Sequence, residues 1–146
     1  INENKPLGTM GSLGKIKNEL NYPIILTNAD LITDINFNHL IDYHNLYKSD
    51  ATMALHTYQS QNPYGEIKLS GNKIENIKEK PTTKSFINAG VYSFSKKSMK
   101  LLKSNEYCDA TQYFLKLKEN NYNILGYPLH EQWNDIGNYE DLKKLK

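Results

Sequence analysis

The chain has 146 residues, which is enough for one domain with a modest hydrophobic core. Its net charge of +2 is too small to indicate a nucleic-acid groove, and every basic residue is a lysine, which excludes a bidentate guanidinium contact to phosphate. The lone Cys108 excludes an internal disulfide and favours a reducing, cytoplasmic location, while the absence of a signal peptide or an apolar run of ~20 residues argues against a membrane partner.

The first part of the chain predicts a helix and then a buried strand. A helix should follow the polar residues 1–9, because Leu13, Ile16 and Leu20 would share one face. The apolar run in 23–28 is typical of a buried strand in a parallel sheet. A loop is then predicted for 30–34, at the carboxyl end of this strand, where open α/β sheets bind their ligands.

The middle of the chain predicts strands around an inserted hairpin. Asn36 is expected to cap a second helix, which a strand at 51–58 follows. A β-hairpin is predicted for 65–78, with a glycine turn at its tip. The next strand, 86–94, contains Gly90, which indicates a bulge or the close approach of a ligand.

The last part predicts helices at 95–102 and 109–120, a strand at 122–127, a polar segment at 132–138 and a terminal helix at 138–145. Strands therefore alternate with helices along the chain. This order predicts an α/β fold, with a mixed, mostly parallel sheet flanked by helices and one inserted β-hairpin.

Two acidic residues far apart in sequence, Asp30 and Asp135, each end a short apolar stretch. If both lie at one sheet edge, they supply the hard carboxylate oxygens that Mg²⁺ prefers beside substrate phosphates. The alternative is that each aspartate only forms a turn. Spacing alone leaves both interpretations open.

Other polar positions have the same ambiguity. Gly8 and Thr9 precede a predicted helix, where backbone N–H groups can meet a ligand or simply start the helix. Glu79 and Lys80 end the hairpin, where they would bind sugar hydroxyls and phosphate or form a solvated turn. The amide of Asn88, inside an apolar strand, needs a partner that is either backbone or ligand.

Together these residues occur in an order that resembles the sugar-nucleotide pyrophosphorylases, the nucleotidyltransferases that act on sugar 1-phosphates. The resemblance covers essentially the whole chain and is strongest to the bacterial guanylyltransferase branch. It implies a Rossmann-like fold. The motifs that carry it are Pro6-Leu7-Gly8-Thr9, Asn28-Ala29-Asp30-Leu31-Ile32-Thr33-Asp34, Tyr64-Gly65, Glu79-Lys80-Pro81, Asn88-Ala89-Gly90-Val91-Tyr92 and Trp133-Asn134-Asp135-Ile136-Gly137.

The resemblance implies a role for each matching residue. A nucleoside triphosphate, with GTP favoured, would react with a sugar 1-phosphate to give a nucleotide sugar and pyrophosphate for glycan or cell-surface polysaccharide synthesis. The implied residues are Gly8 and Thr9 for the nucleotide, Asp30 and Asp135 for Mg²⁺, Lys80 for the sugar phosphate, and Gly65, Glu79, Asn88 and Gly90 for the sugar.

Two departures from the family pattern are Met10 and Ala29, which stand where an alanine and a glycine are usual. The resemblance also implies that 1–146 is a single catalytic domain truncated before its first strand and glycine-rich loop. We therefore expect 1–146 alone to bind triphosphate poorly and to form homo-oligomers through an unpaired sheet edge. A sugar-nucleotide-sensing regulatory subunit of the same fold and a metal-dependent glycosyltransferase are the alternative functions.

Overall fold

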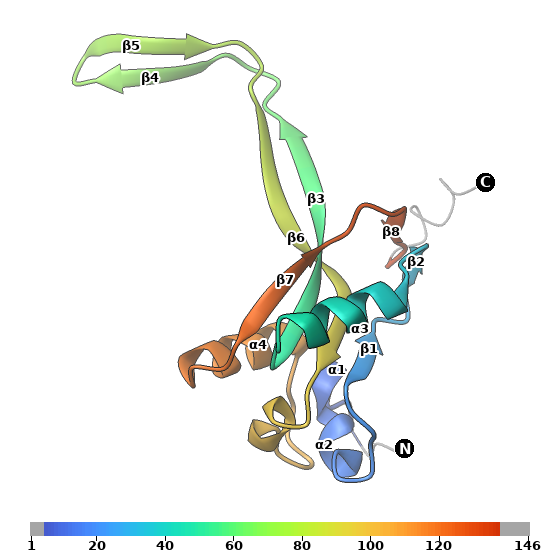
Figure 1. Ribbon diagram of the computed structural model, residues 1–146. Coiled ribbons are helices and arrows are strands. Elements are labelled where there is room, and N and C mark those ends of the chain that lie inside the picture. Colours follow the sequence, from blue (N-terminus) through green and yellow to red (C-terminus); the bar gives the residue numbers. More distant parts are fainter. Residues whose placement is uncertain (1–4, 138–146) are drawn as a thin grey trace.

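The structure is a computed structural model that describes residues 5–137 (Figure 1). The terminal helix predicted for 138–145 lies outside these residues. The helical elements are α1 (Gly8–Gly11), α2 (Leu13–Ile16), α3 (Phe37–Leu46), the 3-10 helix η1 (Ser98–Leu101) and α4 (Ala110–Glu119). The strands are β1 (Ile24–Thr27), β2 (Leu31–Thr33), β3 (Ala51–Gln61), β4 (Glu66–Ser70), β5 (Lys73–Lys78), β6 (Thr82–Phe94), β7 (Ile124–Pro128) and β8 (Trp133–Asp135).

The central sheet has the strand order β1-β6-β3-β7. Strand β3 runs parallel to β7, while β6 runs antiparallel to both β1 and β3. Strands β1, β3 and β7 therefore share one direction, and only β6 opposes them. Two small antiparallel sheets, β2–β8 and β4–β5, accompany the central sheet. The predicted α/β fold, with a mixed and mostly parallel sheet and an inserted hairpin, is confirmed.

Apolar side chains cover both faces of the central sheet. On one face, Tyr92 and Phe94 of β6 pack with Tyr113 and Phe114 of α4. On the other face, Val91 of β6 belongs to a second cluster, which also contains Leu40 of α3. Successive residues of a strand point to opposite faces, so β6 contributes to both clusters. The helices α3 and α4 accordingly flank the sheet on opposite sides (Figure 1).

Strands β3 and β6 extend beyond the core as a two-stranded arm, and the β4–β5 hairpin projects from its end (Figure 1). The side chains of β4 and β5 are all exposed. The strands predicted at 51–58 and 86–94 are shorter than the observed strands β3 and β6. The outer ends of β3 and β6 are polar and have no alternating apolar residues, so the sequence pattern did not predict them as strand.

The single helix predicted after residue 9 is wrong, because the segment forms two separate turns, α1 and α2. A Cβ on Gly11 would lie 2.9 Å from the carbonyl oxygen of Glu106, and one on Gly14 would collide with that of Lys103. These glycines let the segment pack directly on the chain before α4. Within residues 5–137, no helix is long and apolar enough to cross a membrane.

Candidate functional site

The two aspartates singled out from the sequence lie next to each other. Strand β2 replaces the loop predicted for 30–34 and pairs with β8, so that Leu31 faces Asp135. The backbone N–H of Ile136 donates a 2.9 Å hydrogen bond to the carbonyl oxygen of Asp30. This short two-stranded sheet joins segments that are about a hundred residues apart and brings both carboxylates to one place.

Gly137 marks the space between the two carboxylates. A Cβ on Gly137 would lie 3.1 Å from Oδ1 of Asp135 and 3.6 Å from Oδ2 of Asp30. The N–H of Gly137 donates a 2.9 Å hydrogen bond to Oδ1 of Asp135, which fixes that side chain. Both aspartates are exposed, so the space between them is open to a ligand.

This carboxylate pair fits a hard divalent cation. Oxygen ligands with one or two carboxylates are what Mg²⁺ takes, with water and phosphate oxygens completing its shell. The described residues contain no group of three or more His, Cys, Asp or Glu side chains that would enclose a metal. Because two carboxylates fill only part of the coordination shell of Mg²⁺, a cation held by Asp30 and Asp135 would keep positions free for substrate oxygens.

A cleft of about 450 Å³ adjoins the carboxylate pair and connects it to the N-terminal segment. Its walls include Thr9 from α1 and Asp30 from the turn after β1. The structure thus brings Thr9, predicted to contact the nucleotide, and Asp30, predicted to bind Mg²⁺, to the same cleft. The described residues that line it are Thr9, Leu26, Thr27, Asn28, Ala29 and Asp30.

Gly8 and Thr9, the two residues predicted to contact a nucleotide, also stabilise the fold through packing and hydrogen bonding. Thr9 Oγ1 accepts a 2.7 Å hydrogen bond from the N–H of Ala110 and so caps α4. Gly8 adopts a φ of +74°, and a Cβ there would lie 2.7 Å from the carbonyl oxygen of Cys108. The close packing against Cys108 is by itself a sufficient reason for a glycine at this position. The contact of Gly8 with a nucleotide therefore stays a prediction. Met10 is fully buried in the core.

Asn28 is a polar residue that lines the cleft, and no role was predicted for it from the sequence. Its side-chain oxygen Oδ1 is buried and has no hydrogen-bond partner among the described residues. Its backbone N–H donates a 2.8 Å bond to the carbonyl oxygen of Gly90. A buried acceptor without a partner costs free energy unless a ligand or water satisfies it. The signal in the sequence was a polar residue directly after an apolar strand.

The internal Gly90 lies at a bulge, as predicted. The register between β3 and β6 shifts between Met53 and Leu55, and Gly90 in this region takes a φ of +71°. A Cβ there would lie 2.9 Å from Nδ2 of Asn28. The close approach is made by this side chain of the protein itself, so contact between Gly90 and a sugar stays a prediction.

The amide of Asn88 finds both partners inside the protein. Its Nδ2 donates a 2.8 Å hydrogen bond to the hydroxyl of Tyr92, and its Oδ1 accepts a 2.9 Å bond from the N–H of Gly90. Burial raises the pKa of Tyr92, so this phenol stays neutral. The second amide hydrogen of Asn88 has no partner among the described residues, and its contact with a sugar stays a prediction.

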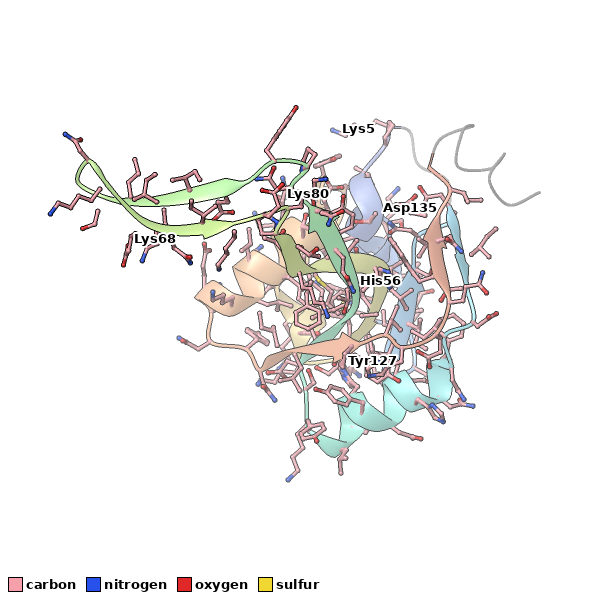
Figure 2. All side chains as sticks on the ribbon, turned by 90° about the horizontal axis from the view of Figure 1, so that it is seen from above. Lys5, His56, Lys68, Lys80, Tyr127 and Asp135 are labelled. Carbon is pink, nitrogen blue, oxygen red and sulfur yellow. The ribbon has the colours of Figure 1, made fainter. Side chains whose placement is uncertain are left out.

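A third group of predicted residues lies at the base of the hairpin. Gly65 and Glu79 are neighbours there, since a Cβ on Gly65 would lie 3.0 Å from Oε2 of Glu79. Lys80 follows with a φ of +42°, and its carbonyl oxygen accepts a 3.3 Å hydrogen bond from Gln61. This group sits at the outer end of the arm. The structure joins these residues to one another but not to Asp30 and Asp135 (Figures 1 and 2).

Trp133 and His56 form a contact that sequence reasoning missed. The indole stacks on the imidazole with ring centroids 4.8 Å apart, and its Nε1 donates a 2.8 Å hydrogen bond to the carbonyl oxygen of Ala89. These contacts fasten β8 to the central sheet and so position Asp135. The signal in the sequence was the only tryptophan of the chain, two residues before Asp135.

Comparison with known proteins assigns the chain to one family. A family model described as nucleotidyl transferase matches residues 1–146. A mannose-1-phosphate guanyltransferase of Debaryomyces hansenii is 29% identical over 95% of the chain, and the bifunctional protein GlmU of Methanococcus maripaludis is 28% identical over 97%. The chain spans 40% and 35% of the lengths of these two relatives.

Solved structures show the same fold. HddC from Yersinia pseudotuberculosis, in a crystal structure complexed with GMP-PN, has a TM-score of 0.67 and 21% identity, covering 99% of this chain and 63% of that one. UDP-glucose pyrophosphorylase from Acinetobacter baumannii also has a TM-score of 0.67, at 18% identity, covering 97% of this chain and 55% of that one.

Proposed function

Because the chain belongs to the nucleotidyl transferase family, we propose that the protein transfers a nucleotidyl group from a nucleoside triphosphate to a sugar 1-phosphate. The observation that carries this proposal is the placement of Asp30 Oδ2 and Asp135 Oδ1 around one space at Gly137, beside a cleft. A metal-binding carboxylate pair is what a reaction between two phosphates requires.

In the proposed reaction, a phosphate oxygen of the sugar 1-phosphate attacks the α-phosphorus of the triphosphate. The new P–O bond forms as the bond from the α-phosphorus to the bridging oxygen of the β-phosphate breaks, and pyrophosphate leaves. Asp30 and Asp135 would hold Mg²⁺. When bound, the metal neutralises charge on the reacting phosphates. Since no covalent intermediate with the protein is needed, catalysis depends on positioning and charge.

The cleft beside Asp30 is the proposed nucleotide site. Thr9 and Asn28 line it, and the buried Oδ1 of Asn28 suits a hydrogen-bond donor such as a ribose hydroxyl or a base N–H. We place Gly8 and Thr9 against the base or ribose. GTP is the favoured triphosphate, because a guanyltransferase is among the relatives and HddC was crystallised with GMP-PN.

The sugar phosphate is proposed to bind along β6 and the hairpin base. Asn88 and Gly90 lie near the core end of the arm, while Gly65, Glu79 and Lys80 lie at its outer end, roughly 20 Å further along β6. For Lys80 to meet the same phosphate as Mg²⁺, the arm must bend toward β8. Glu79 would then accept hydrogen bonds from sugar hydroxyls.

We further propose that the product serves as a precursor of glycans or cell-surface polysaccharides and is made in the cytoplasm. The free cysteine, Cys108, agrees with a reducing compartment. A regulatory subunit that senses nucleotide sugars, and a metal-dependent glycosyltransferase, are the alternatives. The carboxylate pair favours an enzyme over the sensor, and the family favours triphosphate over nucleotide-sugar donors.

The test is pyrophosphate release by the full-length protein with GTP, Mg²⁺ and each of several sugar 1-phosphates. Asp135→Asn should lower the rate about a hundredfold or more, because it removes a ligand of the metal. Asp42→Asn, an exposed aspartate on α3, is the matched control and should leave the rate unchanged.

The alternatives predict other results. A sensor binds nucleotide sugars without turnover, and a glycosyltransferase hydrolyses the nucleotide sugar without any need for pyrophosphate. Either result, or an Asp135→Asn variant as active as the Asp42→Asn control, would overturn the proposed reaction.

A further inference from the structure

A second hollow region lies at the other end of β1 from Asp30. Two adjoining hollows, of about 360 and 210 Å³, share Tyr22 and Lys96 as lining residues. Lys17 and Lys100 also line the larger hollow, and Lys48 lines the smaller one. Because Tyr22 precedes β1 and Asp30 follows it, this region is separate from the candidate nucleotide cleft.

The charge in these hollows is of one sign. The described residues that line them include four lysines and no aspartate or glutamate, although the whole chain is nearly balanced, with 18 basic and 16 acidic residues. A hollow lined by one sign of charge concentrates counter-ions. The lysines are Lys17, Lys48, Lys96 and Lys100.

None of these lysines is neutralised by an ion pair in the described part of the chain. The lysines that form ion pairs there are Lys68, Lys97 and Lys103. The buried carboxylate of Asp50 is already engaged, because it accepts hydrogen bonds from Lys97 and from the N–H of Asn123. The positive charge of the hollows is therefore available to a ligand.

Neighbouring groups hold part of this lining in place. Lys17 Nζ donates to the carbonyl oxygen of Leu102, and the hydroxyl of Tyr22 donates a 2.6 Å bond to the carbonyl oxygen of Lys17. These bonds fix the backbone around Tyr22 and Lys17, while the ammonium groups of Lys96 and Lys100 make no hydrogen bond or ion pair in the described part of the chain. Lys96 lies where the two hollows meet, so one extended anion can contact lysines on both sides.

We propose that this region is a second anion site, which binds a ligand carrying a diphosphate group. Two linked phosphates match two adjoining hollows with lysines around both. Each phosphate oxygen would accept hydrogen bonds from lysine ammonium groups, which donate three each. The ring of Tyr22 adds apolar surface for whatever group the diphosphate carries.

The experiment is calorimetric titration of the full-length protein with two probes, inorganic pyrophosphate and ADP, without divalent metal. The Lys96→Gln/Lys100→Gln double variant should weaken binding about tenfold or more, because two charged hydrogen bonds are lost. Lys73→Gln/Lys84→Gln is the matched control, since both lysines are exposed on the hairpin and arm and lack ion pairs among the described residues. It should bind like the unchanged protein.

The site is supported if pyrophosphate, ADP or both bind and if only the Lys96/Lys100 variant loses affinity. Which of the two probes binds more tightly tells whether a free or an attached diphosphate is preferred. Asp30→Asn should leave this binding intact, which separates the second site from the candidate nucleotide cleft. The proposal is overturned if neither probe binds, if the double variant binds as tightly as the unchanged protein, or if the control variant loses affinity equally.

Discussion

Gly90 and Asn28 pack so closely that no side chain fits between them. A Cβ on Gly90 would lie 2.9 Å from Nδ2 of Asn28 and 3.0 Å from Cδ1 of Leu31. The same glycine has a φ of +71°, in the region that other residues avoid. The bulge in β6 thus packs against Asn28, a lining residue of the candidate nucleotide cleft, on the side away from the cleft.

Gly90→Ala should destabilise the protein by about 2–4 kcal/mol, because it combines a left-handed backbone with overpacking. Urea unfolding measures the change in free energy. Gly71→Ala is the matched control, since Gly71 also has a positive φ, of +59°, but has nothing within 4 Å of the new methyl group. It should cost only about 1 kcal/mol, from the left-handed backbone alone. Equal losses in the two variants would mean that the contact with Asn28 is unimportant.

Trp133→Phe should cost about 1–2 kcal/mol, because the carbonyl oxygen of Ala89 loses its hydrogen bond from Nε1. Since Trp133 fastens β8, the same variant should also raise the concentration of Mg²⁺ needed for half-maximal activity. Tyr64→Phe removes a hydroxyl from a side chain that is 76% exposed. It should change neither the urea midpoint nor the metal dependence, and an identical effect in both variants would contradict the role given to β8.

Removal of divalent metal by a chelator should abolish the proposed activity, and added Mg²⁺ should restore it, because the two carboxylates alone leave the phosphate charges unscreened. Asp30→Asn removes one of the two charges at Gly137. It should shift the half-maximal Mg²⁺ concentration upward about tenfold or more. A metal titration of initial rates measures both effects, and an unchanged titration curve for Asp30→Asn would assign the metal to other residues.

His44 should make the stability depend on pH. It is 2% exposed, and burial lowers its pKa below the usual value, partly opposed by the charge of Asp50. The unfolded chain therefore binds a proton at a higher pH than the folded one, so the free energy of unfolding should fall as pH drops below about 6.5, until the folded pKa is also passed. Urea midpoints at several pH values measure this slope.

His44→Gln is the comparison for that pH dependence, because an amide does not titrate and can still bond Thr52, whose Oγ1 lies 2.9 Å from Nδ1 of His44. The slope below pH 6.5 should be smaller in this variant. If the two slopes are the same, another group is responsible for the acid sensitivity.

Strand β1 lies at one edge of the central sheet and pairs only with β6 in the described part of the chain. An unpaired edge of Ile24, Ile25 and Leu26 favours pairing with a second chain. Residues 1–146 should therefore form dimers or larger species in light scattering. Ile25→Lys should shift them toward monomer, and a monodisperse monomer of the unchanged chain would contradict this expectation.

Local patterns in the sequence predicted the elements that local chemistry determines. Asn36 was expected to cap a helix, and its Oδ1 accepts a 3.0 Å hydrogen bond from the N–H of Asn38. The apolar run before Thr27 predicted a strand, and β1 forms there, although it is half-buried and pairs antiparallel with β6 instead of lying buried in a parallel sheet. The Ser70-Gly71-Asn72 turn predicted the hairpin. In each case the residues that predict the element lie within a few residues of the element itself.

The parts that were missed depend on distant partners. The three residues of β2 are too few to identify a strand from their sequence alone, and they pair with β8 from the other end of the chain. The predicted single helix is divided between Gly11 and Leu13, and the chain around Lys103 and Glu106 packs closely on Gly11 and Gly14 there. The proximity of Asp30 to Asp135 was expected only through a family resemblance, since spacing alone could not distinguish a metal site from two turns.

The only tryptophan of the chain has a practical consequence for experiments on the candidate site. Trp133 lies two residues from Asp135, and its ring rests on His56. Light that excites indole selectively therefore reports on this strand without interference from the eleven tyrosines. The emission of the unlabelled protein is a built-in optical signal for events beside the paired carboxylates.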